Sequence, residues 1–468
     1  MRLLKQSIIF LTFNFVFSMT NVSAAELPDW TKNVGSRTRP SGNFKVDVAQ
    51  YGAIGDGKTL CTKNIQAAID ACAEKGGGRV EFPKGEYLTG ALFVKSNVEL
   101  HIGEDVTLRA IRNIDHFPEM PTRIAGIEMV WPVAIINVIG QKNVAITGKG
   151  LIDGDGVYHW YRFWEMFDDY TKRGLHGLVD YDCKRVRMVL VSDSEDVTLS
   201  GFTLTRSSFW TITLLYSTQC TVSGITIRNT IGGFGPSVDG INMDSSSHIL
   251  VENCDVDCND DNICLKSGRG VDGLRVNRPT EYVLIRNCIT RHGEGISCGS
   301  ETAGGIRYIY CVNSKAIGTS ATLRIKSAMN RGGTVEHIYM DNVETYRTPC
   351  FLNCEVSWNP SYSYPIIPPE YEGKELPPHW TKLLTRVPSE QGIPTFRNIF
   401  ISNITGNKVR TFVKCDGAEN SIIDGVSLSN VNVQAGTAGT VKYTRNFTMN
   451  NVQLKTDDDS QIVVEDIP

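Results

Sequence analysis

Charged residues interrupt the apolar pattern of this chain in four consecutive segments. From Asp239 through Asp260 and Glu294 to Arg324, successive separations are 21, 34 and 30 residues. The segments read "SVDGINMD", "NDDNICLKSG", "RHGEGISCGSE" and "ATLRIKSAM", and the charged residues of interest in them are Asp239, Asp260, Asp261, Glu294, Arg324 and Lys326. Asp and Asn are also common turn residues, so the recurrence, more than any single segment, points to function.

Carboxyl groups that are held close together repel one another when charged, so the pKa of one rises while that of another stays low. Such a pair supplies a general acid and a general base near neutral pH. Glycoside hydrolysis uses this arrangement: the acid protonates the leaving oxygen, and the carboxylate activates water or attacks the sugar. Arg324 and Lys326 would bind a substrate carboxylate through charge-assisted hydrogen bonds.

The elements that must position these residues are short repeated strands. Segments of alternating apolar and polar residues, which is strand periodicity, begin at Asn97, Asn143, Asp196, Gln219, His248, Tyr282, Tyr308, His337, Asn398, Gly425 and Asn446. Between Asp196 and His337 successive starts lie 23, 29, 34, 26 and 29 residues apart. One such unit cannot bury its own apolar face, whereas stacked units share a continuous core.

The repeat predicts an all-β fold, a right-handed parallel β-helix. A propeller is the rival, but its blades would need about forty residues each and antiparallel hairpins. Equivalent positions in stacked coils lie about 4.8 Å apart. The four charged segments would therefore meet on one face and line one short groove.

The ends and excursions complete the predicted domain. Residues 61–75, "CTKNIQAAIDACAEK", have helical spacing and are expected to cap the N-terminal coil, because a bare coil end exposes a sheet edge. Excursions are expected near 155–185 and 345–395, where aromatic residues and prolines break the repeat. We predict a single domain over residues 26–468.

The first thirty residues have the plan of a secretory signal peptide. Arg2 and Lys5 precede an apolar run that is too short to span a bilayer, and small residues follow at Ala24 and Ala25. We therefore expect a cleaved leader over residues 1–25, export to the periplasm or the medium, and no membrane anchor. The chain has 41% hydrophobic residues, and its net charge of −4 argues against nucleic acid as a partner.

Thirteen cysteines are an odd number, so they cannot all pair within one chain. Most lie in apolar strand-like runs and are expected to be buried as small hydrophobic side chains. Cys254 and Cys258 have the spacing of a disulfide or metal clip, but no matching His or Cys pair accompanies them. We expect no metal and no cofactor.

The four segments together resemble the polygalacturonase-like family 28 of the glycoside hydrolases, whose fold is the pectin-lyase-like β-helix. The resemblance extends from "YGAIGDGKT" at Tyr51 over nearly all of the rest of the chain. The family motifs are Asn-Thr-Asp, Asp-Asp, Gly-His-Gly and Arg-Ile-Lys. Here Ser237 replaces the Asn of the first motif, "DDNICLKSG" matches the second and "RIKS" matches the fourth.

The third motif departs from that pattern. "EGISCGS" places Glu294 where polygalacturonases carry His, and His292 is two residues out of register unless the alignment has slipped. The rhamnogalacturonan hydrolases of the family carry Glu at this position. The resemblance thus implies cleavage of the α-1,2 bond between galacturonate and rhamnose in rhamnogalacturonan I, with α-1,4 homogalacturonan as the alternative substrate.

The resemblance also implies roles for the individual residues. Asp260 is the expected general acid, and Asp239 and Asp261 hold and activate water in an inverting reaction. Glu294 lies near the acid or contacts the substrate, while Arg324 and Lys326 bind the galacturonate carboxylate.

Other interpretations remain open at this point. Lys266 is interpreted as structural. Trp358 and Trp380 are either sugar platforms or loop packing. Endo and exo attack stay undecided. A β-helix polysaccharide lyase that uses calcium and a non-catalytic carbohydrate-binding β-helix are the alternatives from other classes. The expected partner is a pectic polysaccharide or oligosaccharide, and the expected state is a monomer.

Overall fold

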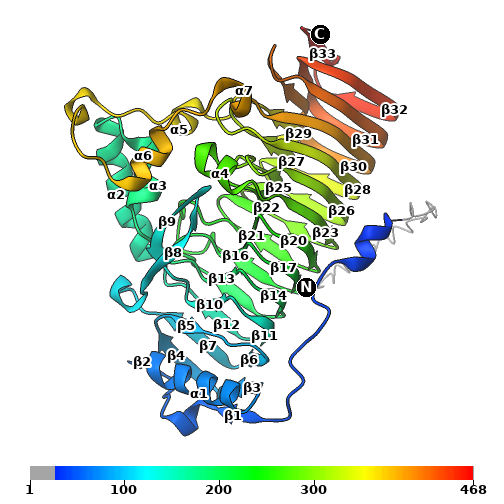
Figure 1. The fold of residues 1–468 in the computed structure, drawn as a ribbon. Helices are drawn as coiled ribbons and strands as arrows, with labels where there is room; N and C mark the ends of the chain where they lie inside the picture. The colour runs from blue at the N-terminus through cyan, green and yellow to red at the C-terminus, as the bar shows by residue number, and fades with distance from the viewer. Residues whose placement is uncertain (1–26, 467–468) are drawn as a thin grey trace, which may run out of the picture.

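The computed structural model describes residues 27–466, and the predicted leader lies outside the described residues. Thirty-one parallel strands form one continuous sheet that coils into a right-handed parallel β-helix, as predicted (Figure 1). The described residues contain no helix that is long and apolar enough to cross a bilayer.

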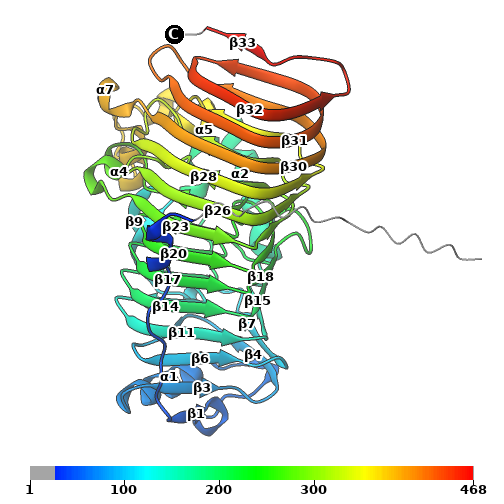
Figure 2. The same cartoon turned by 90° about the vertical axis from the view of Figure 1, so that its right-hand side faces the viewer.

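The strands stack on three faces of the coil, and Figure 2 shows the stack from the side. The first face contains β1 (Lys45–Asp47), β3 (Gly78–Glu81), β6 (Val98–Ile102), β11 (Lys142–Gly148), β14 (Glu195–Ser200), β17 (Thr218–Ser223), β20 (Ser247–Glu252), β23 (Thr280–Arg286), β26 (Ile306–Ile317), β28 (Thr334–Tyr346), β30 (Thr395–Asp416), β31 (Ile423–Lys442) and β32 (Thr444–Thr456). The second contains β2 (Asp56–Leu60), β4 (Gly85–Thr89), β7 (Val106–Ala110), β12 (Leu151–Asp153), β15 (Thr203–Thr205), β18 (Thr226–Arg228), β21 (Asp255–Asp257) and β24 (Ile289–Thr290).

The third face, which we call the site face, carries the charged segments. It contains β5 (Leu92–Phe93), β10 (Ile136–Ile139), β13 (Val189–Ser192), β16 (Ile212–Leu215), β19 (Ile241–Asp244), β22 (Asp261–Lys266), β25 (Glu294–Cys298), β27 (Ala321–Lys326), β29 (Cys350–Glu355) and β33 (Val463–Glu465). The long strands β30 and β31 bend from the first face into this one, because β29 and β33 pair with their second halves.

The predicted repeat starts occupy one structurally equivalent corner of the coil. Each of these residues has a left-handed backbone with φ between 53° and 74°, and they are Asn97, Asn143, Asp196, Gln219, His248, Tyr282, Tyr308, His337, Asn398, Gly425 and Asn446. Asn, Asp and Gly adopt this conformation at low cost, whereas Tyr does not. Side-chain stacking accompanies the costly cases: the rings of Tyr282 and Tyr308 lie 5.0 Å apart and parallel.

The core follows from the alternation within each strand. In β19, β22, β25 and β27 the inward residues Ile241, Ile263, Ile296 and Leu323 pair in register and are buried. The residues that alternate with these apolar positions point outward, so outward residues of successive coils become neighbours on the site face. All thirteen cysteines are free of disulfides and twelve are buried, in agreement with the expected small hydrophobic side chains.

Helices cap and flank the coil. The predicted N-terminal cap is α1 (Thr62–Glu74), which buries Ile65, Ala68, Ile69 and Cys72 against the first coil. The other helical elements are η1 (Asp29–Asn33), η2 (Val48–Tyr51), η3 (Ile114–His116), α2 (Val157–Lys172), η4 (His176–Leu178), α3 (Val179–Asp182), α4 (Gly270–Val276), α5 (Pro360–Ser363), η5 (Pro369–Tyr371), α6 (Pro378–Leu384) and α7 (Ser389–Gly392).

Three excursions leave the coil beside the site face (Figure 1). Residues 154–188 contain α2 and α3, close to the predicted 155–185. The second predicted excursion is shorter than 345–395, because "CFLNCE" forms the coil strand β29 and the chain leaves the coil only over residues 356–394. The third was not predicted: it is the antiparallel hairpin β8 (Glu119–Ile124) with β9 (Ile127–Pro132).

Candidate active site

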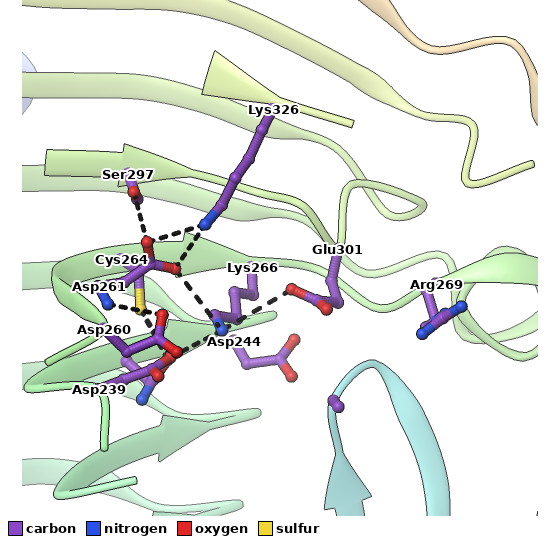
Figure 3. A network of polar contacts seen from close by, with 12 residues as sticks. Asp239, Asp244, Asp260, Asp261, Cys264, Lys266, Arg269, Ser297, Glu301 and Lys326 are labelled. Atoms are coloured by element: carbon purple, nitrogen blue, oxygen red, sulfur yellow. Dashed lines mark hydrogen bonds and ion pairs between the residues drawn. The ribbon is translucent and has the colours of Figure 1, made fainter. Parts of the chain in front are cut away.

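The site face brings three of the predicted acidic residues together with two lysines (Figure 3). Asp261 accepts hydrogen bonds from Lys326 Nζ at 2.9 Å and from Ser297 Oγ at 2.7 Å. Asp239 accepts one from Lys266 Nζ at 2.8 Å. Lys266 Nζ also lies 4.0 Å from Asp261, so the two lysines link the two carboxylates.

Burial and charge separate the pKa values of these carboxyl groups, as the sequence predicted. Burial raises the pKa of Asp260 well above its usual range, and the neighbouring Asp239 and Asp261 carboxylates raise it further. Burial also raises the pKa of Asp239, although Lys266 opposes the shift. Burial would raise the pKa of Asp261 too, but Lys326 and Lys266 outweigh it and lower that pKa. The pKa of Asp260 is therefore shifted upward and that of Asp261 downward, although the two residues are adjacent.

These groups line a cavity of about 230 Å³ on the site face. Its lining residues are Ala125, Asp180, Phe209, Trp210, Ser237, Asp239, Asp260, Asp261, Lys266, Ser300, Glu301, Lys326, Trp358, Asn359 and Tyr362. The volume is below the roughly 300–1,000 Å³ that is usual for drug-sized ligands. The cavity therefore has a size suited to one sugar unit.

Glu294 and Arg324 lie beside this cavity but are not part of its lining. Arg324 forms ion pairs with both Glu294 and Glu355. Glu294 donates its backbone N–H to the Asp260 carbonyl at 3.0 Å, which places it next to the acid. Lys326 therefore faces the cavity as predicted, whereas the guanidinium of Arg324 is already shared by two carboxylates.

The register supports Glu294 over His292 at the third motif. Glu294 pairs directly with Asp261 across β25 and β22. The His292 side chain is 72% exposed and its Nδ1 lies 3.0 Å from Asp257, outside the cavity. Glu294, and not His292, therefore lies opposite the Asp-Asp motif in the neighbouring coil.

Three further charged residues of the cavity, Asp180, Lys266 and Glu301, received no functional role from the sequence. Lys266, interpreted as structural, faces the cavity beside Asp239. Glu301 was missed: it lies 3.8 Å from Lys266 and 3.1 Å from Arg331, and although burial opposes the shift, Lys266 and Arg331 lower its pKa to about 2. Glu301 follows Lys266 by 35 residues and precedes Lys326 by 25, so coil spacing alone could have found it.

The two predicted aromatic platforms have different environments. Trp358 lines the cavity, with Lys326 Nζ 5.1 Å from its ring centre. Trp380 is buried in α6 and donates to Asp182 at 2.9 Å, so it packs the excursions together. Ser237, which replaces the motif Asn, donates to Asp180 at 2.8 Å at the cavity edge.

Ligand atoms of Asp239, Asp261 and Cys264 lie within 4.8 Å of one another, a spacing that a metal ion could use. The ammonium groups of Lys266 and Lys326 already supply positive charge to both carboxylates. A hard divalent cation prefers six or more oxygen ligands, which this group of two carboxylates and a buried thiol does not offer. The residues therefore fit acid–base chemistry better than metal binding.

Comparison with known proteins identifies the family. Residues 72–348 match the family model described as Glycosyl hydrolases family 28. A probable polygalacturonase from Vitis vinifera is 29% identical over 376 residues, which cover 77% of this chain and 74% of the relative. An exo-poly-alpha-D-galacturonosidase from Dickeya chrysanthemi is 28% identical, over 70% of this chain and 60% of that protein.

Solved structures agree on the fold. The structure of a hyperthermoactive exopolygalacturonase from Thermotoga maritima superposes with a TM-score of 0.73 at 24% identity, covering 91% of this chain and 94% of that one. At this level of identity the similarity concerns the β-helix itself.

Proposed function

Because this chain belongs to glycosyl hydrolase family 28, we propose that it hydrolyses an α-linked galacturonate bond in pectin with inversion at the anomeric carbon. The observation that carries the proposal is the separation of carboxyl pKa values within one sugar-sized cavity. The pKa of Asp260 is raised and that of Asp261 is lowered, and both residues lie in the same lining. Its relatives named as polygalacturonases and galacturonosidases support the choice of sugar.

Asp260 serves as the general acid in this proposal. Its raised pKa keeps a proton available for the glycosidic oxygen as the bond to the leaving sugar breaks. Loss of that proton leaves the carboxylate charge in a buried site, where Lys326 and Lys266 partly offset it.

Asp239 and Asp261 position the attacking water. Oxygen atoms of the two carboxylates lie within 4.8 Å of each other. One water molecule between them can therefore donate one hydrogen bond to each carboxylate. The ionised Asp261 takes the proton as the water attacks the face of the sugar opposite the leaving group. Lys266 and Lys326 face the same cavity and would bind the galacturonate carboxylate as point charges.

The leaving sugar lies beside Glu294 in this arrangement, and we propose that it is rhamnose. Arg324 is shared by Glu294 and Glu355, so carboxylates outnumber guanidinium groups there. A second uronate carboxylate at this place would meet like charge, whereas a neutral sugar would not.

Homogalacturonan is the second candidate substrate. The relatives named as polygalacturonases favour it. On that substrate the leaving sugar is a uronate, so Arg324 would have to exchange a carboxylate partner for the substrate. The two candidate substrates therefore differ in whether Arg324 must break an ion pair with Glu294 or Glu355 when the substrate binds.

The test offers size-matched oligosaccharides of the rhamnogalacturonan I backbone and of homogalacturonan to the purified protein and follows the products by mass spectrometry. We expect products heavier by one water from the first substrate, with a higher kcat/KM than on the second. Asp260→Asn, with its fold checked by circular dichroism, is the inactive control.

Each other outcome has a definite meaning. Faster cleavage of homogalacturonan would show that the leaving sugar is galacturonate and not rhamnose. Products with the ultraviolet absorbance of an unsaturated uronate and loss of activity in chelator would make the protein a lyase. Binding without any release of reducing ends would make it a carbohydrate-binding protein.

A further inference from the structure

The cavity has two boundaries of different origin. Its floor is the site face, from which Asp239, Asp261, Lys266 and Lys326 project. Its opposite boundary, here called the wall, is formed by residues from all three excursions: Ala125 at the tip of the β8–β9 hairpin, Asp180 of α3, and Trp358, Asn359 and Tyr362 at and before α5. No residue of the wall belongs to a coil strand.

One buried arginine joins the three parts of the wall. Arg269 donates from Nη1 to the Tyr181 hydroxyl at 2.8 Å and from Nη2 to the Ser363 carbonyl at 3.2 Å. Its backbone N–H donates to the Gly126 carbonyl at the hairpin tip at 2.9 Å. Tyr181 in turn donates to the Ala125 carbonyl at 2.8 Å. A fully desolvated guanidinium with these partners resists separation, because each freed donor would be left unsatisfied.

The aromatic residues of the wall pack on one cation of the site face, Lys326, and on two arginines of the adjoining loops. The Lys326 ammonium and the Arg331 guanidinium lie 5.1 and 5.5 Å from the ring centre of Trp358. Arg269 lies 5.2 Å from the ring centre of Tyr362. Cation–π contacts are stronger between desolvated groups than at exposed sites. The wall is therefore packed onto the floor, and Figure 3 shows Arg269 and the hairpin beside Glu301 at this end of the site.

We infer that the wall ends the binding groove, so that the enzyme releases only the galacturonate at the non-reducing end of its substrate. The sugar whose anomeric carbon is attacked must lie between Asp239, Asp261 and Asp260, inside the cavity. The wall leaves no path for a further sugar on that side. The leaving part of the oligosaccharide extends past Glu294, which lies outside the cavity lining.

This inference rests on the proposed function, and it is tested with two end-modified substrates. The first is a hexasaccharide labelled at its reducing end, and the second carries an unsaturated uronate at its non-reducing end. From the first we expect unlabelled galacturonate together with labelled pentasaccharide from the earliest time point. We expect the second to be cleaved at least a hundredfold more slowly.

The outcomes separate the two proposals. A ladder of labelled products from the start, or ready cleavage of the blocked substrate, would overturn the inference and leave the hydrolase assignment standing. Labelled monosaccharide as the first product would mean attack from the reducing end and would also overturn it. No cleavage of any galacturonide would refute the proposed function itself.

A variant tests the wall directly. Tyr362→Ala removes a ring that lines the cavity and packs on Arg269, and we expect the share of internal cleavage to rise at least tenfold. Tyr371→Ala is the matched control, since it removes a tyrosine of the same excursion that contacts Arg173 and does not line the cavity. An unchanged product pattern in folded Tyr362→Ala would show that Tyr362 does not bound the groove.

Discussion

The floor and the wall of the cavity contribute different properties to the same site. Among the floor residues, Asp239 closely precedes β19, Asp261 and Lys266 lie in β22, and Lys326 lies in β27, so the strand register sets their mutual positions. The wall residues come from three excursions that Arg269 holds together. The comparison teaches that the repeated part of the fold supplies the chemistry, while the non-repeated parts decide which substrates reach it.

The largest effect is expected in the floor. Asp260→Asn removes the proton donor with little change in shape, and we expect kcat to fall by roughly 10²–10⁴-fold. Initial rates on the preferred oligosaccharide measure it, and an unchanged Tm shows that the fold survives. The adjacent Asn259→Ala, outside the cavity lining, is the control. Near-native rates in Asp260→Asn would refute the acid assignment.

Glu301, another charged residue of the cavity, links the site to the stability of the fold. The pKa of Glu301 is lowered to about 2 from an ordinary 4.5, so it stabilises the fold fully above pH 4.5, and this contribution is lost as the pH falls through 2. A shift of this size corresponds to about 3 kcal/mol. We expect Glu301→Gln to lower the free energy of unfolding by about that amount at pH 7.

Denaturant titrations of wild type and Glu301→Gln between pH 7 and pH 2 measure this effect. The difference between the two proteins should shrink as the pH falls below 4.5. A constant difference over the whole range would show that Glu301 acts through packing and not through its charge.

The pH profile of kcat tests how the floor lysines shift the pKa values of the acid and the base. Activity should fall at high pH as Asp260 loses its proton and at low pH as Asp261 gains one. Lys326 is the largest influence that lowers the pKa of Asp261, so Lys326→Met should move the acid limb to higher pH. Lys315→Met, an exposed residue of β26, is the control. An acid limb that stays in place would argue against Asp261 as the base.

The smallest effect is expected where the leaving sugar lies. Glu294→Gln keeps the shape and removes one of the two carboxylates on Arg324, so we expect the preference for rhamnogalacturonan over homogalacturonan to fall by roughly tenfold. The ratio of the two kcat/KM values measures it, and Glu344→Gln on the exposed first face is the control. Glu294→His should not produce a full polygalacturonase, because Glu355 still pairs with Arg324.

The sequence predicted the floor well and the wall poorly. Alternation and a repeat of 23 to 34 residues determine the coil, and the same repeat brings Asp239, Asp260, Asp261 and Lys326 to one place. Coil spacing would also have identified Glu301. The partnership of Arg324 with Glu355 was not predicted, because it depends on β29, whose strand pattern is hidden between aromatic and proline-rich stretches.

There is a physical reason why the wall could not be predicted from the sequence. Ala125, Asp180 and Tyr362 belong to segments without periodicity, and nothing in their spacing relates one to another. Their meeting point is set by the tertiary contacts of Arg269, a residue that in sequence only follows the Asp-Asp motif. Long-range contacts between non-repeating segments carry no local signal.

The anomeric configuration of the first product tests the central claim most directly. Proton NMR during the first minutes of hydrolysis, before mutarotation, reports the configuration at the new reducing end. If Asp239 and Asp261 direct a water molecule against the α-linked sugar while Asp260 protonates the leaving oxygen, the product is the β-anomer. An α-anomer would mean a covalent intermediate on one of these carboxylates and would contradict the account.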